Sequence, residues 1–195
     1  MLHGQQGTPY IYQGEELGMT NITLPIEKYV DLETLNVYEE RLAQGYDKED
    51  IMKSIHARSR DNGRTPMQWT ADANAGFTTG TPWLPINENY TEINAEAALA
   101  DEDSVFHYYQ KLIKMRKTYP VFRDGSFTLL CPKDEKIFAY TRDVENEHML
   151  VVCNFTEETL KFDIPKEYKN AECLISNYED VTSELRPYEA YMLRY

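Results

Sequence analysis

Two stretches in the first half of the sequence repeat apolar residues at helical spacing. The first places four apolar side chains on one helix face: Leu32, Leu35, Tyr38 and Leu42. Because Gly45 follows closely and suits the left-handed backbone that ends many helices, we predict that this helix stops there. Asp47 is a good N-cap for a second helix, which carries Ile51, Met52 and Ile55 on one side. The pattern therefore predicts two consecutive helices.

A third helix is predicted to begin at Asp103 or Ser104. Its apolar stripe consists of Val105, Phe106, Tyr109, Leu112 and Ile113. Lysine and arginine in the last turn complement the helix dipole, and the Tyr119-Pro120 step ends the helix. We place a domain boundary there, between residues 1–119 and residues 120–195.

After residue 120 the pattern changes to short extended runs with turn-rich or charged breaks between them. The runs cover residues 127–130, 137–142, 149–155, 160–164, 172–176 and 190–195. Their spacing of roughly ten residues is typical of an antiparallel β-sandwich. Near the amino terminus, the apolar run Tyr10-Ile11-Tyr12 predicts a buried parallel strand over residues 8–13. Residues 74–94 lack periodicity, and such a long connection is uncommon unless it is functional.

The most informative stretch is SRDNGRTPMQW, at residues 59–69. Its Asn62-Gly63 turn signal and its Thr65-Pro66 step make regular helix or strand unexpected across it. Arg60 and Arg64 offer planar donors that pair with carboxylates, and Trp69 offers a flat apolar face. This chemistry suits either a loop that grips a sugar or a buried structural ion-pair turn, and the residues alone leave both open.

Several motifs in the same order resemble those of the α-glucosidases of glycoside hydrolase family 13. They are GTPYIYQGEELGMTN at residues 7–21, the loop at 59–69, NAGF at 74–77, PW at 82–83 and LRPYEA at 185–190. The chain is most similar to oligo-1,6-glucosidases, glucan 1,6-α-glucosidases and trehalose-6-phosphate hydrolases. The resemblance covers essentially the whole chain, yet only the carboxy-terminal part of such an enzyme.

The resemblance implies an α/β plus all-β fold, in which the terminal strand and helices of a (β/α)8 barrel precede an antiparallel β-sandwich. A complete barrel needs ~250 residues, which the 195 residues here do not provide. In the family, the nucleophilic Asp, the acid/base Glu and a third Asp lie on earlier barrel segments, and no stretch here matches them. We therefore expect that the chain is a fragment and that the amino-terminal part of the barrel is its missing partner.

The implied parent is a retaining α-glucosidase that hydrolyses α-1,6-glucosidic bonds at the non-reducing end of isomalto-oligosaccharides or dextran. We expect the fragment alone to be inactive. The alternatives are a fragment of a trehalose-6-phosphate hydrolase or of an α-1,4-glucosidase, and a non-catalytic sandwich module. For the sandwich, a stabilising role is favoured over carbohydrate binding, since its apolar runs look committed to packing. In isolation, residues 1 to about 118 are expected to be mobile, swapped or rearranged while the sandwich folds.

The family pattern assigns an arginine of the 59–69 loop to the non-reducing glucose of the oligosaccharide substrate. Arg64 is the first choice and Arg60 the second. The carboxylate that pairs with this arginine in the family is expected to be absent, which would leave a guanidinium unpaired. Asp61 is expected to fix the loop through local hydrogen bonds, and Trp69 to pack in the core rather than stack on a sugar. Gln13 and Asn21 are weaker candidates for substrate contact, on position alone.

Glu15 and Glu16 are the tempting catalytic pair, since glycoside hydrolysis needs two carboxyl groups about the scissile bond. Successive side chains of an extended chain point to opposite faces, so these two are not expected to serve one bond. We expect instead that one organises its loop by accepting hydrogen bonds while the other faces water.

Composition narrows the function classes further. Twenty basic and 33 acidic residues give a net charge of −13, which argues against nucleic acid and anionic membranes as partners. No apolar run approaches the ~20 residues of a membrane span. Three cysteines without metal-ligand spacing and four scattered histidines suggest no metal or other cofactor, and favour a reducing cytoplasm.

Overall fold

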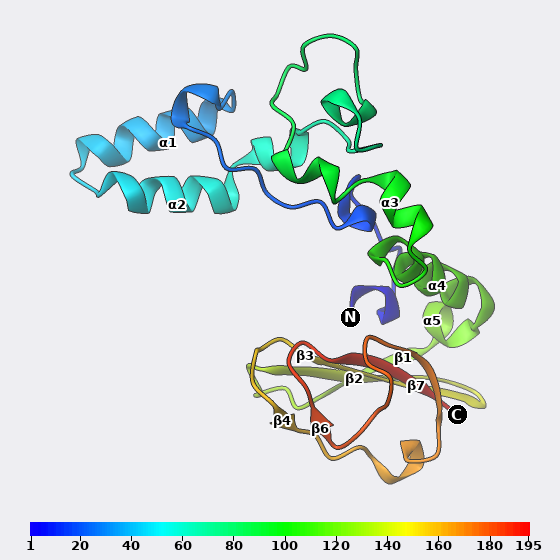
Figure 1. Ribbon diagram of the computed structural model, residues 1–195. Coiled ribbons are helices and arrows are strands. Elements are labelled where there is room, and N and C mark those ends of the chain that lie inside the picture. The colour runs from blue at the N-terminus through cyan, green and yellow to red at the C-terminus, as the bar shows by residue number, and fades with distance from the viewer. The chain divides into compact units, whose positions relative to one another are not determined.

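The computed structural model describes all residues from Met1 to Tyr195. The chain divides into two compact units (Figure 1). One unit consists of residues 11–109, and the other combines residues 1–10 with residues 110–195. Each unit has its own packed interior, and no helix in either combines the length and apolar character that a membrane crossing requires.

A pair of helices organises the 11–109 unit. Helix α1 spans Leu32–Ala43 and helix α2 spans Lys48–Arg58. The predicted cap at Asp47 is confirmed, because its carboxylate accepts the N–H groups of Glu49 and Asp50 at 2.8 and 3.3 Å. Gly45 has the predicted left-handed backbone, with φ of 83°. The interior of this part is formed by Ile22, Leu24, Tyr29, Tyr38, Ile51 and Ile55.

The predicted apolar stripe of α1 is only partly buried. Tyr38 is buried and Leu35 packs against the interior, whereas Leu32 is 73% exposed. The remaining elements of the unit are short. They are the 3-10 helices Glu15–Leu17, Ile26–Lys28, Arg60–Arg64, Ala73–Gly76 and Glu88–Thr91, helix α3 at Ala95–Ala100, and the start of helix α4 at Val105–Thr118. Helix α3 was not predicted, although Asn94 caps it by accepting the N–H of Ala97 at 2.8 Å.

The strand predicted at residues 8–13 is absent. A strand exists through ladder hydrogen bonds to a neighbour, and no other segment pairs with these residues. Instead, the N–H of Tyr12 turns to the carboxylate of Glu15 at 3.1 Å, at the entrance to the 3-10 helix Glu15–Leu17. The segment is therefore an exposed connection that leads into a tight turn.

The second unit contains an antiparallel sheet of five strands in the order β1-β2-β3-β7-β5. The strands are β1 Ser126–Leu130, β2 Ile137–Val144, β3 Glu147–Asn154, β7 Ala190–Arg194 and β5 Glu172–Ser176. A second sheet pairs β4 Leu160–Lys161 with β6 Glu184–Leu185, and the 3-10 helix Lys166–Tyr168 lies between β4 and β5 in the chain. The predicted antiparallel β-sandwich is confirmed, with β6 as an additional short strand.

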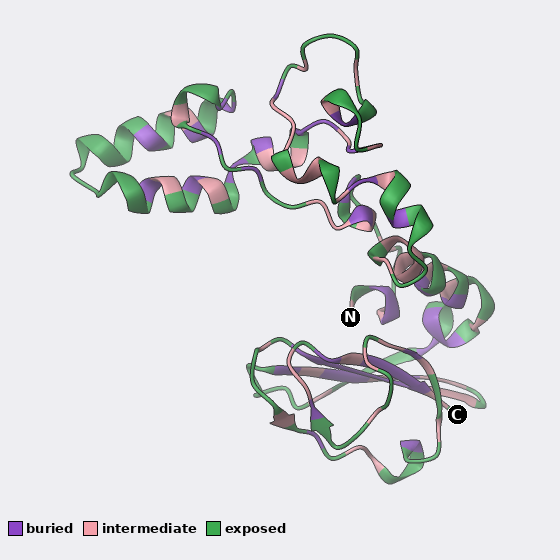
Figure 2. Cartoon of the chain, in the orientation of Figure 1, coloured by how far each residue is buried: buried purple, intermediate pink, exposed green.

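Both faces of the five-stranded sheet are covered within this unit, as the buried central strands in Figure 2 show. One face forms the interior between the two sheets, which consists of Ile137, Ala139, Leu150, Val152, Phe162, Tyr168, Leu185, Tyr191 and Leu193. The other face meets helix α5 at Pro120–Asp124 and the 3-10 helix Leu2–Gly4. At Gly4, a Cβ atom would lie 2.3 Å from the Tyr140 hydroxyl, so only glycine fits there.

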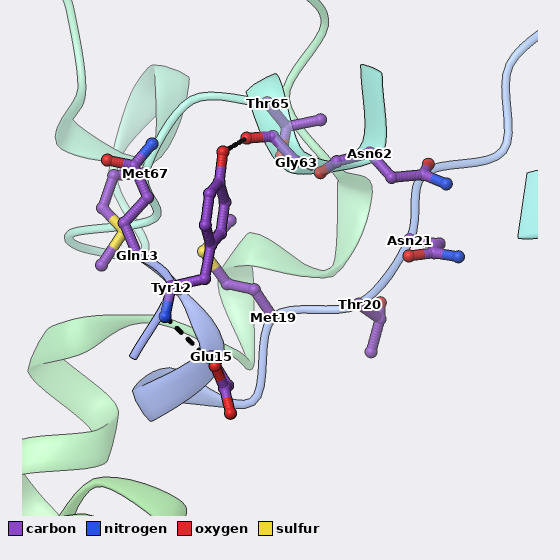
Figure 3. A pocket seen from close by; sticks show the side chains of 11 residues that line it. Tyr12, Gln13, Glu15, Met19, Thr20, Asn21, Asn62, Gly63, Thr65 and Met67 are labelled. Atoms are coloured by element: carbon purple, nitrogen blue, oxygen red, sulfur yellow. Dashed lines mark hydrogen bonds between the residues drawn. The ribbon is translucent and has the colours of Figure 1, made fainter. Parts of the chain in front are cut away.

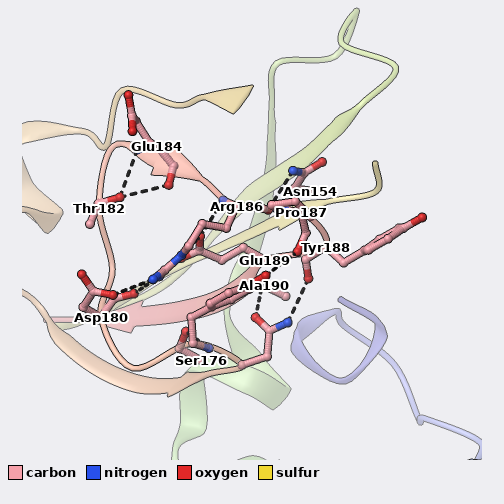
Figure 4. A network of polar contacts seen from close by, with 12 residues as sticks. Asn154, Ser176, Asp180, Thr182, Glu184, Arg186, Pro187, Tyr188, Glu189 and Ala190 are labelled. Carbon is pink, nitrogen blue, oxygen red and sulfur yellow. Dashed lines mark hydrogen bonds and ion pairs between the residues drawn. The ribbon is translucent and has the colours of Figure 1, made fainter. Parts of the chain in front are cut away.

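The LRPYEA motif stabilises the sandwich through an ion pair between the partly exposed Arg186 and the buried Glu189 (Figure 4). Glu189 is fully buried, and its two carboxylate oxygens accept Nε and Nη2 of Arg186 at 2.9 and 3.0 Å. The hydrogen bonds to Glu189 and Asp180 raise the pKa of Arg186. Asn154 donates to the Arg186 carbonyl at 2.9 Å, and this ties the motif to β3. A bidentate and hydrogen-bonded pair of this kind fixes the conformation of its turn.

Candidate functional site

The arginine loop, residues 59–69, begins as a 3-10 helix rather than as an irregular turn. The helix spans Arg60–Arg64, and the Ser59 hydroxyl caps it by accepting the N–H of Asp61 at 3.3 Å. Thr65 then adopts extended geometry, with φ of −61° and ψ of 149°, as the following proline requires. One turn of helix and an extended step therefore present Arg60 and Arg64 on the same short segment.

Asp61 anchors this loop as predicted, but its hydrogen bonds reach beyond the loop and are not only the local ones that were expected. Its side chain is fully buried, and Oδ2 accepts the backbone N–H groups of Val30 and Asp31 at 2.8 and 3.0 Å. The other oxygen, Oδ1, lies 3.2 Å from Nη1 of Arg64. A single carboxylate thus joins the arginine loop to the two residues that precede helix α1.

Asp31 is the second buried carboxylate and contacts both arginines. Its Oδ1 lies 2.8 Å from Arg60 Nη2 and 3.2 Å from Arg64 Nη1, while Oδ2 caps α1 by accepting the N–H of Thr34. Burial by itself would raise the pKa of Asp31, but the hydrogen bonds from Arg60, Thr34 and Arg64 outweigh it and hold the pKa below its usual 3.8. Sequence reasoning did not single out Asp31.

The two arginines are therefore ion-paired, and the expected unpaired guanidinium does not occur. Arg60 is 57% exposed and also lies 3.2 Å from Glu33, and its contact with Asp31 raises its pKa. Arg64 is 39% exposed and shares Asp31 and Asp61. Asp31 and Asp61, two carboxylates of this chain, pair with the arginines instead. Of the two open alternatives, the structure shows the ion-pair turn, and it leaves the Arg64 side chain partly exposed.

The segment after residue 11 lies beside the arginine loop and shares a hollow with it (Figure 3). Tyr12 crosses between them, and its hydroxyl donates to the Gly63 carbonyl at 2.6 Å. Asn62 accepts the N–H of Ile22 at 3.2 Å. The hollow measures about 300 Å³, and both Gln13 and Asn21 line it. The amide of Asn21 is also engaged, because it donates to the backbone carbonyls of His56 and Ala57.

The carboxylates of Glu15 and Glu16 stabilise the turn that contains them and do not form a catalytic pair on one glycosidic bond. Glu15 accepts the N–H of Tyr12 and also the hydroxyl of Tyr109, while Glu16 accepts the N–H of Gly14 at 2.8 Å. Burial, reinforced by the hydrogen bond to Glu15, raises the pKa of Tyr109. The expectation that one of the two carboxylates merely faces water is therefore wrong, since both accept backbone N–H groups.

A second hollow of about 420 Å³ adjoins the first, with Gln13, Thr65 and Met67 in both linings. Its wall carries three exposed aromatic side chains: Trp69 at 48%, Phe77 at 47% and Trp83 at 75%. The predicted core packing of Trp69 is therefore wrong. Phe77 and Trp83 were present in the NAGF and PW motifs but were not recognised as candidates, because their convergence depends on the loop geometry.

Nowhere do three or more His, Cys, Asp or Glu side chains gather in a way that suits a metal ion. The site thus consists of two ion-paired arginines, amide and hydroxyl groups, and an aromatic wall. This combination suits a ligand that offers many hydroxyls and apolar ring faces.

Comparison with known protein families shows which family the chain belongs to. A family model described as the catalytic domain of alpha amylase matches residues 1–125, and a model of the maltogenic amylase C-terminal domain matches residues 127–192. The chain belongs to the alpha-amylase family. The break between the two matches falls at the start of strand β1, where the helical part gives way to the sandwich. The alpha-amylase segment therefore contains the arginine loop and both hollows.

The similar proteins match nearly the whole of this chain, but the chain covers only part of each of them. The oligo-1,6-glucosidase of Parageobacillus thermoglucosidasius is 52% identical over 97% of this chain, and the trehalose-6-phosphate hydrolase of Bacillus subtilis strain 168 is 48% identical over 99%. The crystal structure of Bacillus licheniformis trehalose-6-phosphate hydrolase matches 98% of the chain with a TM-score of 0.92 and 42% identity. The chain spans 35% to 36% of the length of these relatives.

Proposed function

We propose that the chain is the carboxy-terminal portion of a cytoplasmic retaining α-glucosidase. The parent enzyme hydrolyses α-1,6-glucosidic bonds at the non-reducing end of isomalto-oligosaccharides or dextran in carbohydrate metabolism. Residues 1–119 complete its barrel, and residues 120–195 form its C-terminal sandwich. The observation that carries the proposal is the partly exposed Arg64 beside a hollow, in a chain 52% identical to an oligo-1,6-glucosidase.

In this proposal Arg64 and Arg60 bind the terminal glucose, with Arg64 in the leading role. Arg64 is held by two buried carboxylates, so its direction is set before substrate arrives. Its charge is already balanced by Asp31 and Asp61, which favours donation to neutral hydroxyl groups over capture of a phosphate group. This balance favours isomalto-oligosaccharides over trehalose 6-phosphate, although relatives of both kinds match the chain.

The chemical step belongs to carboxyl groups outside this chain. Retaining glycoside hydrolysis uses one carboxylate as nucleophile and one carboxylic acid to protonate the leaving oxygen, about 5–5.5 Å apart. The acidic groups near the arginine loop are all committed, because Asp31 and Asp61 hold arginines while Glu15 and Glu16 hold backbone N–H groups. The chain thus supplies substrate positioning to a reaction that other residues of the parent perform.

A chimera tests this function. In it, the present chain replaces the matching last third of the Parageobacillus oligo-1,6-glucosidase, and glucose release from isomaltose is measured. We expect activity from the chimera and none from the present chain alone. Arg64→Ala in the chimera should lower kcat/KM by at least about 100-fold, whereas Arg58→Ala, an exposed arginine at the end of α2, should change it less than threefold. A folded chimera that is inactive, or one that is indifferent to Arg64→Ala, would refute the proposal.

A further inference from the structure

The two outer strands of the five-stranded sheet differ in how their free edges are protected. Strand β5 carries Glu172, which forms an ion pair with Arg194, and a bulge between Cys173 and Ile175 interrupts its pairing with β7. Charged residues and bulges are features by which natural proteins keep an edge strand from pairing with another chain. Strand β1 has neither, because its five residues all pair in regular register with β2 and include no charged residue and no proline. The outer side of β1 is therefore an open edge.

Strand β1 also carries apolar side chains that its own unit leaves exposed. Phe127 is 43% exposed and Leu129 is 40% exposed, whereas Leu130 packs against the interior between the two sheets. Because side chains alternate along a strand, Phe127 and Leu129 lie on the same face of the sheet. The strand ends after Leu130, where Cys131 adopts the left-handed region with φ of 52°. A short, uncharged edge with an exposed apolar pair is suited to pairing with one further strand.

The charge around β1 allows that further strand to come from a second copy of the chain. The net charge of −13 repels copies from one another over most of the surface. Residues 123–136, which contain β1, have no net charge, because three side chains are basic and three acidic: Arg123, Lys133 and Lys136, and Asp124, Asp134 and Glu135. The matching residues around β5, 169–182, contain one basic and three acidic side chains, a net charge of −2. Two copies therefore meet less repulsion at β1 than at the other edge.

We propose that two copies of the chain associate through β1, which pairs antiparallel with β1 of the second copy and joins the two five-stranded sheets into one. The two-fold axis of such a pair is perpendicular to the sheet, so opposed residues point to the same face. Only registers centred on a residue meet this condition, and the register centred on Thr128 pairs all five residues of the strand. It places Phe127 of each copy opposite Leu129 of the other, and this apolar contact removes both side chains from water.

Sedimentation equilibrium of the complete 195-residue chain measures the association. A strand pair of five residues is smaller than a standard interface of about 1,600 Å², so we expect a reversible monomer–dimer equilibrium. Leu129→Lys should raise the dissociation constant by at least about tenfold, because it places a charge on the open edge. Phe155→Lys is the matched control, since Phe155 is 55% exposed in the same unit but lies outside β1, and it should leave the equilibrium unchanged. A dimer that persists in Leu129→Lys would overturn the inference.

A disulfide test reports the register independently of any loss of folding. It uses a chain in which the exposed Cys131 and Cys173 are replaced by serine. In Thr128→Cys the new thiol meets its own counterpart across the two-fold axis, with Cα atoms about 4.5–5.5 Å apart, so mild oxidation should link the copies. In Ser126→Cys the counterparts are displaced by about 13 Å along the strand and should stay unlinked. Equal linking at the two positions, or a natural chain that stays monomeric up to about 1 mM, would overturn the inference.

Discussion

At the scale of single residues, Asp61 is the side chain on which the arginine loop depends most. Its fully buried carboxylate accepts two backbone N–H groups and one guanidinium. In Asp61→Asn, the amide nitrogen would face a donor and leave at least one buried group unsatisfied. We expect a loss of about 1–3 kcal/mol in the free energy of unfolding, measured by urea denaturation. Asp50→Asn is the control, because its ion pair with Lys53 is exposed on both sides and should contribute under about 0.5 kcal/mol.

Through Asp31, the stability of the arginine loop should depend on pH. Its pKa in the folded chain lies below the usual 3.8, so the contribution of Asp31 to stability is present above about pH 4 and is lost as pH falls further. We expect Asp31→Asn to be less stable than the natural chain at pH 7, and the difference to shrink between pH 5 and pH 2. Thermal unfolding across this range measures it. A difference that stays constant across this range would mean that the charge of Asp31 contributes nothing to stability.

At the scale of elements, the strained turn at Ala73–Gly76 positions the aromatic wall. Gly76 has φ of 64°, and a Cβ atom on it would lie 2.7 Å from the Thr70 hydroxyl oxygen. Gly76→Ala should therefore destabilise the chain by about 1–2 kcal/mol, measured by urea denaturation, because the added methyl group meets Thr70 in a backbone conformation that favours glycine. Gly80→Ala is a matched control, since its nearest contact would be an ordinary 3.7 Å. Equal stability of the two variants would show that the turn does not depend on Gly76.

The elements that could be predicted from the sequence are those with local causes. Helix α2 has its own cap at Asp47, and the long strands β2 and β3 have their own apolar runs. The elements that the sequence did not predict correctly depend on pairing with segments distant in the chain. Strand β6 has two residues and exists only because Leu185 pairs with Leu160, and residues 8–13 fail as a strand because nothing pairs with them.

The same distinction applies to the candidate site. Arg64 and Asp61 were predicted because they lie in one contiguous motif, and Asp61 was confirmed as the anchor of the loop. Asp31 was missed because it is 29 residues from Arg60 and 33 residues from Arg64 in the sequence, with helices α1 and α2 between them. Phe77 was missed because two successive left-handed residues precede it; asparagine tolerates this conformation, but alanine rarely adopts it, so the turn at Asn74-Ala75 could not be predicted.

At the scale of the whole molecule, the amino-terminal residues belong to the unit that contains the sandwich. Arg116 of α4 donates to the carbonyls of His3, Gln5 and Gly7. The hydroxyl of Tyr140 donates to the Met1 carbonyl at 2.7 Å. These contacts refine the expectation that residues 1 to about 118 become mobile together. We expect residues 1–10 to share the protection of the sandwich, and any early opening to involve residues 11–109.

The protection of residues 1–10 should depend on Arg142, which is fully buried and is bound by carbonyl groups rather than by a carboxylate. Its guanidinium donates instead to the carbonyls of Gly4, Phe122, Gly125 and Ser126, and burial lowers its pKa. Arg142→Met would keep the volume but leave these carbonyls without donors. We expect a loss of about 3 kcal/mol or more in the free energy of unfolding.

Hydrogen exchange on the complete chain distinguishes a local effect of Arg142→Met from a global one. The amides of Gly4 and Gln5 donate within the first 3-10 helix, so they report directly on residues 1–10. In Arg142→Met they should exchange faster by a larger factor than the amide of Val151 in the centre of β3, because they lose a local support in addition to global stability. Arg116→Met should accelerate the same two amides with little effect on Val151, since its carbonyl contacts are confined to residues 3–7. Fast exchange of Gly4 and Gln5 in the natural chain would instead mean that the two arginines do not hold the amino terminus.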